Sequence, residues 1–418
     1  MKTAVALSET PQVTKKTFNL YACFLAIMPV LATYASGIPG FSVTDVLLVL
    51  FTAYAALWPS VRTKNRYAVS VNGLLIGVGL IIGFSLIAQL ADPSDVTNVA
   101  IRTIRYAFYL FAFLFTSKRL LDVERLQVYV KRVSVLASFY IFLQFTLYTL
   151  FGFVLKGYIS LFELYVPSYA TTDYEAIYSI MYRPTSFFLE PAHFARYAII
   201  CLILFLFAKD VRVSDILMGG ILSLGIVLST SSQGYVLLAL VWFIFVLACV
   251  VKTRGRTARV FGLFAILIAP VLLLLLLSLP AVRSTLLRSL SGGGITDGNS
   301  ALGARLGGYM YFFDLTPFHK LFGVGFGSIP EGSWLPSAAY WLYGSGILVF
   351  AVYVIFLLYA LRRLKGANRM ILLVMFILFF SDDCFYSYMC VLFYSLALLT
   401  KEERYETPSL YRDRVEIG

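Results

Sequence analysis

The segment YRPTSFFLEPAHFARYAII, residues 182–200, places ionisable side chains at the start of an apolar run. Arg183, Glu190, His193 and Arg196 lie within fourteen residues of one another. A charge at the centre of a bilayer costs several kcal/mol, so such a cluster indicates function. A carboxylate or an imidazole there can accept a proton, and guanidinium groups hold anions, phosphate in particular, through paired hydrogen bonds. The residue types therefore predict proton transfer beside a bound anion.

A helix must position these side chains, and Pro191 is favoured in its first turn because proline needs no amide hydrogen there. At about 100° per residue, Glu190, His193 and Arg196 share a helix face about 120° wide. Arg196 lies roughly 9 Å along the axis from Glu190. We therefore predict a polar stripe that faces a pocket open to one side of the membrane. The alternative is an interfacial ion pair between Glu190 and Arg196.

Composition gives the class of protein. Hydrophobic residues make up 60% of the 418, and charged residues only 13%, whereas soluble domains carry about 25% charged residues. We predict an all-α polytopic membrane protein, a single transmembrane domain over residues 1–418 with about twelve helices of about 20 residues. The expected spans are 18–36, 41–58, 70–90, 97–116, 133–155, 189–208, 212–230, 232–251, 259–280, 335–360, 368–381 and 384–400.

Basic residues predict the orientation, because Lys and Arg are retained on the cytoplasmic side of a membrane. With the N-terminus inside, 25 of the 34 fall in cytoplasmic segments, so both termini are expected there. The net charge of +12 is dispersed over these loops, which excludes a nucleic-acid-binding patch. The five cysteines show no metal-ligand spacing, so no metal site is predicted. The nine outer basic residues are Arg102, Arg105, Lys156, Arg183, Arg196, Arg283, Arg288, Arg305 and Lys320.

Further candidates lie on the same outer side. The outer loops 156–188 and 281–334 are long, and long loops are usually functional or disordered. In the second loop, Arg305 and Tyr309 of ALGARLGGYMYFF, with Glu331 behind them, could clamp a phosphate or a sugar, or could be structural.

Arg102 and Arg105 are three residues apart on one helix face. They could grip a pyrophosphate, or they could reach lipid headgroups. The outer turn STSSQG, which contains Ser232 and Gln233, is expected to cap a helix.

Taken in order, these motifs resemble the O-antigen polymerase and O-antigen ligase superfamily of bacterial inner-membrane glycosyltransferases. The resemblance covers about residues 182–350, through RPTSFFLEPAHFARY, STSSQG, RLGGYMYFF, LFGVGFGSIP and WLYGSGI. Many members carry an arginine where this chain has Gln233, and ligases carry a histidine where it has EGSWLP. The second departure argues against a ligase-type histidine base, and a ligase that transfers glycan to lipid A-core stays the alternative to a polymerase. A flippase or transporter of lipid-linked glycan is the third alternative, and its charges would line the membrane midplane.

The resemblance implies a GT-C-type membrane fold that polymerises undecaprenyl-pyrophosphate-linked repeat units into O-antigen or a related surface polysaccharide of the lipopolysaccharide type. Donor and acceptor are both lipid-linked glycans, transfer is inverting and metal-independent at the periplasmic face, and no cofactor is required. Membrane lipids and a polysaccharide chain-length regulator are the implied partners. The implied catalytic residues are Arg183, Glu190, His193, Arg196 and Arg305, and the implied substrate-binding residues are Arg102, Arg105, Ser232, Gln233, Tyr309 and Glu331.

Overall fold

The structure is a computed structural model that describes residues 12–58, 63, 65–93, 95–166, 182–252, 283, 301–330 and 333–401. Nearly all regular elements are helices, as expected of an all-α protein. The one sheet of the described residues is a short antiparallel ribbon of β1 (Asn65–Tyr67) and β2 (Leu399–Lys401). Expected span 259–280, Glu331, and much of both outer loops lie outside the described residues.

Several helices are long and apolar enough to cross a membrane, which agrees with a membrane protein. Within the described ranges there are five such segments: α3 (Asn72–Ala91), α4 (Val96–Phe111) continued by the π-helix η1 (Ala112–Ser117) and by α5 (Lys118–Leu120), α6 (Val123–Phe151), α10 (Ser232–Lys252) and α15 (Ser337–Arg363). Shorter apolar helices are the segment Thr17–Leu31 of α1 (Gln12–Leu31), α2 (Val43–Leu57), α8 (Pro191–Leu206), α9 (Val213–Leu228), α16 (Gly366–Ser381) and α17 (Met389–Leu398).

These helices fall at the expected ranges, with one large difference in length. α6 begins at Val123, ten residues before the expected span 133–155. Asp122 is the reason, because its side chain accepts the Arg125 N–H as an N-cap, so the helix starts outside the apolar run. Helix boundaries that depend on a cap are not visible in hydropathy.

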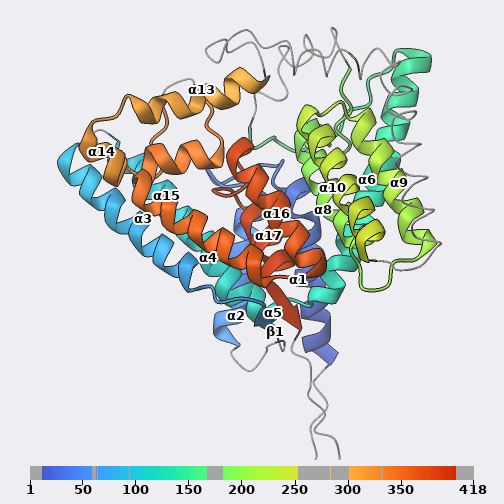
Figure 1. Ribbon diagram of the computed structural model, residues 1–418, viewed down its shortest axis with the longest axis horizontal. Helices are drawn as coiled ribbons and strands as arrows, with labels where there is room; N and C mark the ends of the chain where they lie inside the picture. The colour runs from blue at the N-terminus through green and yellow to red at the C-terminus, as the bar shows by residue number, and fades with distance from the viewer. Residues whose placement is uncertain are drawn as a thin grey trace, which may run out of the picture.

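The helices form two groups joined through a central layer (Figure 1). α6, α8, α9 and α10 pack against one another on one side, and α3, α14 (Pro317–Phe322) and α15 pack together on the other. α13 (Ala301–Phe313) lies across α15. α16 contacts both α8 and α15, so it connects the two groups.

Burial follows from the apolar character of the central helices. Every residue of α17 is buried, and so is α8 from Phe194 to Leu206. A helix that is apolar on all sides belongs in the interior of a larger assembly. The side chain of Arg196 therefore emerges from a helix that has no face toward solvent.

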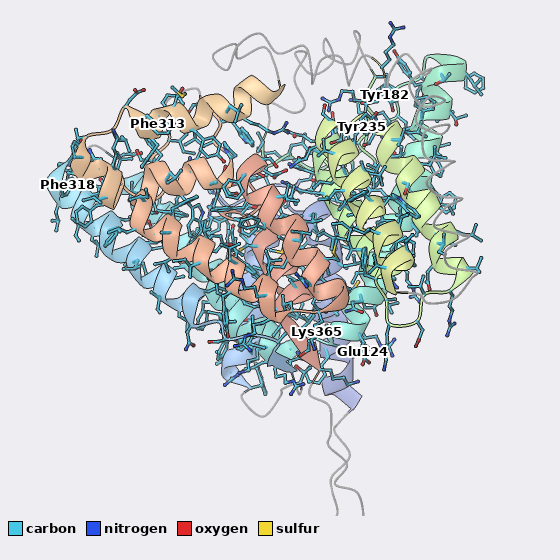
Figure 2. The ribbon with its side chains drawn as sticks, in the orientation of Figure 1. Glu124, Tyr182, Tyr235, Phe313, Phe318 and Lys365 are labelled. Carbon is cyan, nitrogen blue, oxygen red and sulfur yellow. The ribbon has the colours of Figure 1, made fainter. Side chains whose placement is uncertain are left out.

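The bundle has two distinct ends (Figure 2). The ribbon end carries β1 and β2, with Glu124 and Lys365 near it. At the opposite end, which we call the site end, α8, α10 and α15 begin and α16 ends; Tyr182, Tyr235 and Phe313 lie there.

Glycines close the site end on the side of α15. Gly323 has φ +77°, and a Cβ there would lie 2.3 Å from the Gly344 carbonyl oxygen. Gly346, also with φ +77°, interrupts α15 with a non-helical turn. The GVGFG segment thus packs its backbone against a kink in α15, which fixes the position of the first turns of that helix. This contact requires residues without side chains.

Candidate functional site

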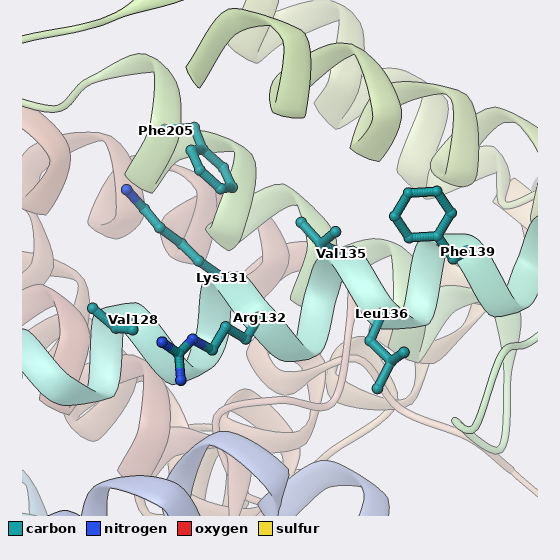
Figure 3. A pocket seen from close by; sticks show the side chains of 7 residues that line it. All are labelled: Val128, Lys131, Arg132, Val135, Leu136, Phe139 and Phe205. Carbon is teal, nitrogen blue, oxygen red and sulfur yellow. The ribbon is translucent and has the colours of Figure 1, made fainter. Parts of the chain in front are cut away.

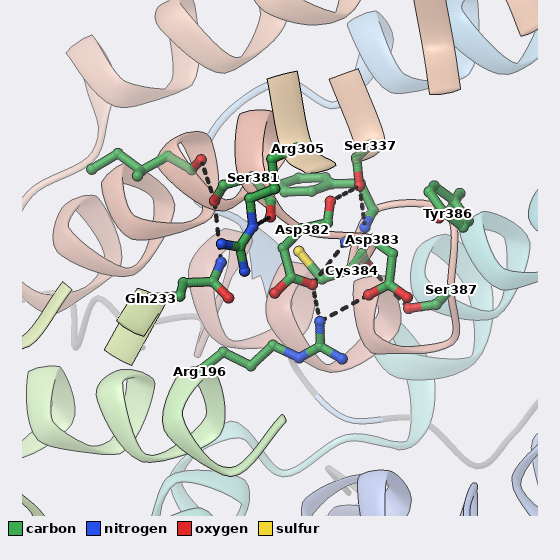
Figure 4. Close-up of polar contacts among 12 residues, drawn as sticks. Arg196, Gln233, Arg305, Ser337, Ser381, Asp382, Asp383, Cys384, Tyr386 and Ser387 are labelled. Carbon is green, nitrogen blue, oxygen red and sulfur yellow. Dashed lines mark hydrogen bonds and ion pairs between the residues drawn. The ribbon is translucent and has the colours of Figure 1, made fainter. Parts of the chain in front are cut away.

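Arg196 is the most deeply buried charge of the predicted stripe. Its side chain is 3% exposed, in the second turn of α8. An uncompensated charge in such surroundings is strongly destabilising, so the guanidinium requires acidic partners. Its Nη1 donates to the carboxylates of Asp382 and Asp383, at 2.9 Å for Asp383 Oδ1 (Figure 4). The ion pairs of Arg196 are thus made with another helix end, and not with Glu190 as the interfacial alternative required.

The two carboxylates stand at the corner where α16 ends. The side chain of Asp382 is 7% exposed and that of Asp383 is 32% exposed. The Asp383 N–H donates to Asp382 Oδ1 at 2.7 Å. Ser337, at the start of α15, donates to the Asp382 carbonyl through its N–H at 2.7 Å and its hydroxyl at 2.6 Å. Hydrogen bonds from Arg196, from the Asp383 N–H and from the N–H and hydroxyl of Ser337 therefore hold this corner. Of the two carboxylates, that of Asp383 is the more exposed.

Burial and neighbouring charge shift the pKa values of the two acids in opposite directions. Burial raises the pKa of Asp382 above its usual range, and Arg196 offsets this only in part. Burial acts on Asp383 too, but the Arg196 charge and hydrogen bonds from Asp382 and Arg196 outweigh it, so the pKa of Asp383 lies below its usual range. Neighbouring carboxylates oppose each other's ionisation. Asp383 is therefore the carboxylate of the pair, and Asp382 takes up a proton first.

The C-terminus of α16 collects further donors. The last carbonyls of a helix lack intrahelical partners, and cations are favoured near them. Arg305 Nε donates to the Ser381 carbonyl at 2.9 Å, and the Tyr309 hydroxyl donates to the Phe380 carbonyl at 2.8 Å. Burial raises the pKa of Tyr309 to about 12, so its hydroxyl stays a donor at neutral pH. Two predicted residues of α13, one turn apart, thus dock on the helix that carries the acids.

Gln233 reaches the same helix end from α10, where its Nε2 donates to the Ser381 hydroxyl at 3.1 Å. The resemblance singled out this position because many family members carry an arginine there. In this chain the amide makes a neutral contact beside Arg305, as Figure 4 shows. Four segments, α8, α10, α13 and α15, therefore converge on the end of α16.

Arg183 lies over the Ser-rich turn that precedes α10. It donates through Nε to Thr230 Oγ1 and through Nη2 to the Thr230 carbonyl, both at 3.4 Å. Ser231 Oγ accepts the Gly234 N–H at 3.2 Å, in agreement with the expected helix cap. A Cβ on Gly234 would lie 2.8 Å from Ala195 Cβ, so the turn sits directly on α8 beside Arg196. Arg183 and Arg196 thus belong to one region.

Glu190 and His193 complete the predicted stripe at the first turn of α8. Glu190 occupies the N-cap position, although its side chain makes no capping hydrogen bond. His193 lies within electrostatic range of Glu190, Arg196 and Asp383. Ser232, the first residue of α10, stands at the same end of the bundle. His193 and Arg196 of the predicted stripe therefore lie near Asp383, while Glu190 precedes the helix in an extended conformation.

The arginine pair of α4 does not act as one unit. Arg105 donates to the Gly40 carbonyl and to the Tyr165 hydroxyl, at 3.3 Å for the latter, so it ties two connecting segments together. Arg102 instead packs on the position of Gly327, where a Cβ would lie 2.7 Å from Arg102 Cβ. A joint grip on pyrophosphate is not the arrangement observed, because a shared helix face does not give two side chains the same neighbours.

Sequence reasoning missed Asp382 and Asp383, although a signal was present. They are the only acidic residues between Glu331 and Glu402 and are adjacent, between two apolar runs. Intramembrane acids are rare and indicate a function or a charged partner. Both residues fall between the expected spans 368–381 and 384–400, so hydropathy alone assigns them to a short loop.

The site end thus combines an ionised, partly open carboxylate with several guanidinium groups anchored by backbone carbonyls. A guanidinium carries five N–H donors in a planar fork that suits phosphate oxygens. A carboxylate beside it can orient a hydroxyl and take its proton. Comparisons of the chain with protein-family models, with curated proteins and with solved structures gave no match.

Proposed function

We propose that this chain is a membrane glycosyltransferase that polymerises undecaprenyl-pyrophosphate-linked oligosaccharide repeat units into O-antigen or a related surface polysaccharide. The observation that carries the proposal is the cluster of Arg196, Asp382 and Asp383, set among Arg183 and Arg305 at one end of the bundle. The motifs within residues 182–350 that resemble the O-antigen polymerase and ligase superfamily also support the proposal. The proposed architecture is of the GT-C type, with about twelve spans, one of them over 259–280.

The proposed orientation places the site end in the periplasm. Lys and Arg concentrate in the segments that join helices at the ribbon end, and such segments are retained in the cytoplasm. Both chain termini are then cytoplasmic, in a bacterial inner membrane. The substrate is anchored by its lipid in the outer leaflet, so its pyrophosphate lies at the level of the site end.

In the proposed reaction, a hydroxyl oxygen of the acceptor glycan attacks the anomeric carbon of the donor. A new C–O bond forms as the bond from that carbon to the pyrophosphate oxygen breaks, and the electron pair leaves with the pyrophosphate. Arg183 and Arg305 stabilise this leaving group, because guanidinium groups bind phosphate oxygens through charge-assisted hydrogen bonds. Attack from the opposite face inverts the anomeric centre.

The proton of the attacking hydroxyl goes to Asp383. Its side chain is the open one of the pair, and Arg196 keeps it ionised and fixed in direction. A carboxylate with a low pKa is sufficient, because the hydroxyl oxygen becomes strongly acidic once it bonds to the anomeric carbon. Glu190 and His193, at the start of α8, orient the acceptor.

Incubation of the purified protein with its native undecaprenyl-pyrophosphate repeat unit tests the proposal. Wild type should give a ladder of products that differ by one repeat unit, and Arg183→Ala and Arg305→Ala should shorten or abolish it. Folded wild type that gives no ladder contradicts a polymerase. Transfer restored by added lipid A-core would then indicate a ligase, and movement of the intact lipid across a vesicle membrane would indicate a transporter.

A further inference from the structure

A groove far from the site end runs along the outer face of α6 (Figure 3). Phe205, near the end of α8, forms one wall, and the groove has a volume of about 420 Å³. Its apolar floor contains Val135, Leu136 and Phe139, while Lys131 and Arg132 lie toward the ribbon end. The groove is therefore apolar along most of its length and cationic at one end.

The side chain of Lys131 is held against the groove wall. Its Nζ lies 4.3 Å from the centre of the Phe205 ring, a cation–π contact that holds the ammonium at the groove wall. Arg132 is exposed next to it. Glu124, in the first turn of α6, pairs with Lys401 at 3.1 Å. The positive charge of the groove is thus not neutralised by that acid.

In a membrane with a hydrocarbon core of about 30 Å, the length of α6 places the two cations toward the depth of lipid headgroups. α6 has 29 residues, so it is about 43 Å long and exceeds the hydrocarbon core of about 30 Å. Lys131 is roughly 12 Å from the start of the helix, and its long side chain extends toward the interface. Leu136 and Phe139 are then exposed to the acyl-chain region.

We propose that this groove binds one anionic phospholipid. Its phosphate contacts Lys131 and Arg132, and one acyl chain lies along Val135, Leu136 and Phe139. Charge complementarity favours an anionic headgroup over a zwitterionic one, because each Lys or Arg near a membrane surface contributes separately to attraction of anionic lipid. The inference is independent of the proposed enzymatic activity.

Native mass spectrometry of the purified full chain tests the site, with phosphatidylglycerol and phosphatidylcholine of identical acyl chains as probes. Wild type should retain one phosphatidylglycerol in preference to phosphatidylcholine. The double variant Lys131→Gln, Arg132→Gln should bind it roughly 20- to 30-fold more weakly, since two surface cations are removed. The exchange variant Lys131→Arg, Arg132→Lys keeps both charges and should retain the lipid.

Arg362 and Arg363 provide the matched control. They are adjacent cations in the last turn of α15, and Arg363 also lies over an aromatic ring, 5.8 Å from the centre of Tyr359. The variant Arg362→Gln, Arg363→Gln should leave the bound phosphatidylglycerol unchanged. Equal weakening by both double variants, no preference in wild type, or a second protein copy in place of the lipid would overturn the proposal.

Discussion

Arg196 and Arg105 are both set into apolar helices toward the same end of the bundle, but they meet opposite kinds of partner. Arg105 binds neutral groups: the Gly40 carbonyl, the Tyr165 hydroxyl and the face of the Phe41 ring, whose centre is 5.2 Å away. Arg196 binds two carboxylates. One arginine fastens connecting segments to α4, and the other sits among ionisable groups.

The different partners indicate different roles, a structural one for Arg105 and one in the proposed reaction for Arg196. Arg105 donates to neutral oxygens, and among the described residues no carboxylate forms an ion pair with it. Arg196 faces two acids, of which one guanidinium can neutralise only one, so the cluster retains a group able to exchange a proton. A buried ion pair adds little net stability compared with apolar packing, which favours a functional reason for this one. The role of a buried arginine is therefore inferred from the groups that accept its hydrogen bonds.

The largest expected effect is that of Arg196→Ala. It leaves the buried Asp382 and the partly exposed Asp383 without a counter-charge, which costs about 3–5 kcal/mol of stability. Unfolding of the purified variant in detergent, followed by circular dichroism, measures the loss. The triple variant Arg196→Met, Asp382→Asn, Asp383→Asn removes all three charges and should regain most of the stability without activity. A triple variant as unstable as Arg196→Ala would contradict the charge argument.

Asp383→Asn should lower the rate of polymerisation by about 10²- to 10⁴-fold, the usual contribution of a positioned proton acceptor. Asp382→Asn is its matched control and should have a smaller effect, because Asp382 is the buried member that is protonated first. Product ladders from equal amounts of folded protein give both rates. Equal losses in the two variants would contradict the assignment of Asp383.

The pH dependence of the rate tests Asp383 as the proton acceptor. The pKa of Asp383 lies below its usual range, so the carboxylate persists and the rate should stay level as the pH falls from about 7 to about 5. The rate should fall only in stronger acid. A loss of most of the rate between about pH 7 and about pH 5 would contradict the assignment of Asp383 as the proton acceptor.

Arg105→Ala should cost about 1.5–3 kcal/mol of stability, the range for hydrogen bonds that involve a charged group. The Gly40 carbonyl keeps the Tyr165 hydroxyl as a donor, and Asp45, whose charge acts on Arg105, keeps its hydrogen bonds from Ser42 and Tyr109. The loss should therefore be smaller than for Arg196→Ala. The same unfolding measurement compares the two, and the product ladder should be unchanged. Arg102 is exposed and lies one turn earlier on α4, so Arg102→Ala is the control and should lower the stability less than Arg105→Ala.

The smallest expected effect is that of Tyr309→Phe. It removes one neutral hydrogen bond to the Phe380 carbonyl, worth about 0.5–1.5 kcal/mol, and should leave the rate nearly unchanged. Tyr311→Phe on the same helix removes a hydroxyl from an exposed ring and should have no effect on unfolding. A large loss of rate in Tyr309→Phe would assign its hydroxyl to the substrate.

Local patterns in the sequence anticipated the helices and part of the site. Apolar runs located the helices, and helical periodicity brought His193 and Arg196 near one another, although Glu190 lies before the helix. Arg305 and Tyr309, four residues apart, both donate to carbonyls at the end of α16. Such features are visible in the sequence because hydropathy and periodicity act over a few turns of chain.

The missing part of the site depends on contacts between distant residues. Arg196 and Asp382 are separated by 186 positions, and Arg105 and Gly40 by 65. Such pairs are set by how helices pack, which hydropathy does not encode. An ion pair within one helix was the simplest partner assignment for Arg196, and the fold supplied acids from the end of another helix instead.

The most direct test places Arg105→Ala and Asp383→Asn side by side in the same polymerisation assay, with unfolding measured on each. We expect Arg105→Ala to be the less stable protein and yet to produce a full ladder at the wild-type rate, while Asp383→Asn forms product about 10²- to 10⁴-fold more slowly. A full ladder from Asp383→Asn, with the ladder lost in Arg105→Ala, would contradict the account and would move the chemistry to the outer end of α4.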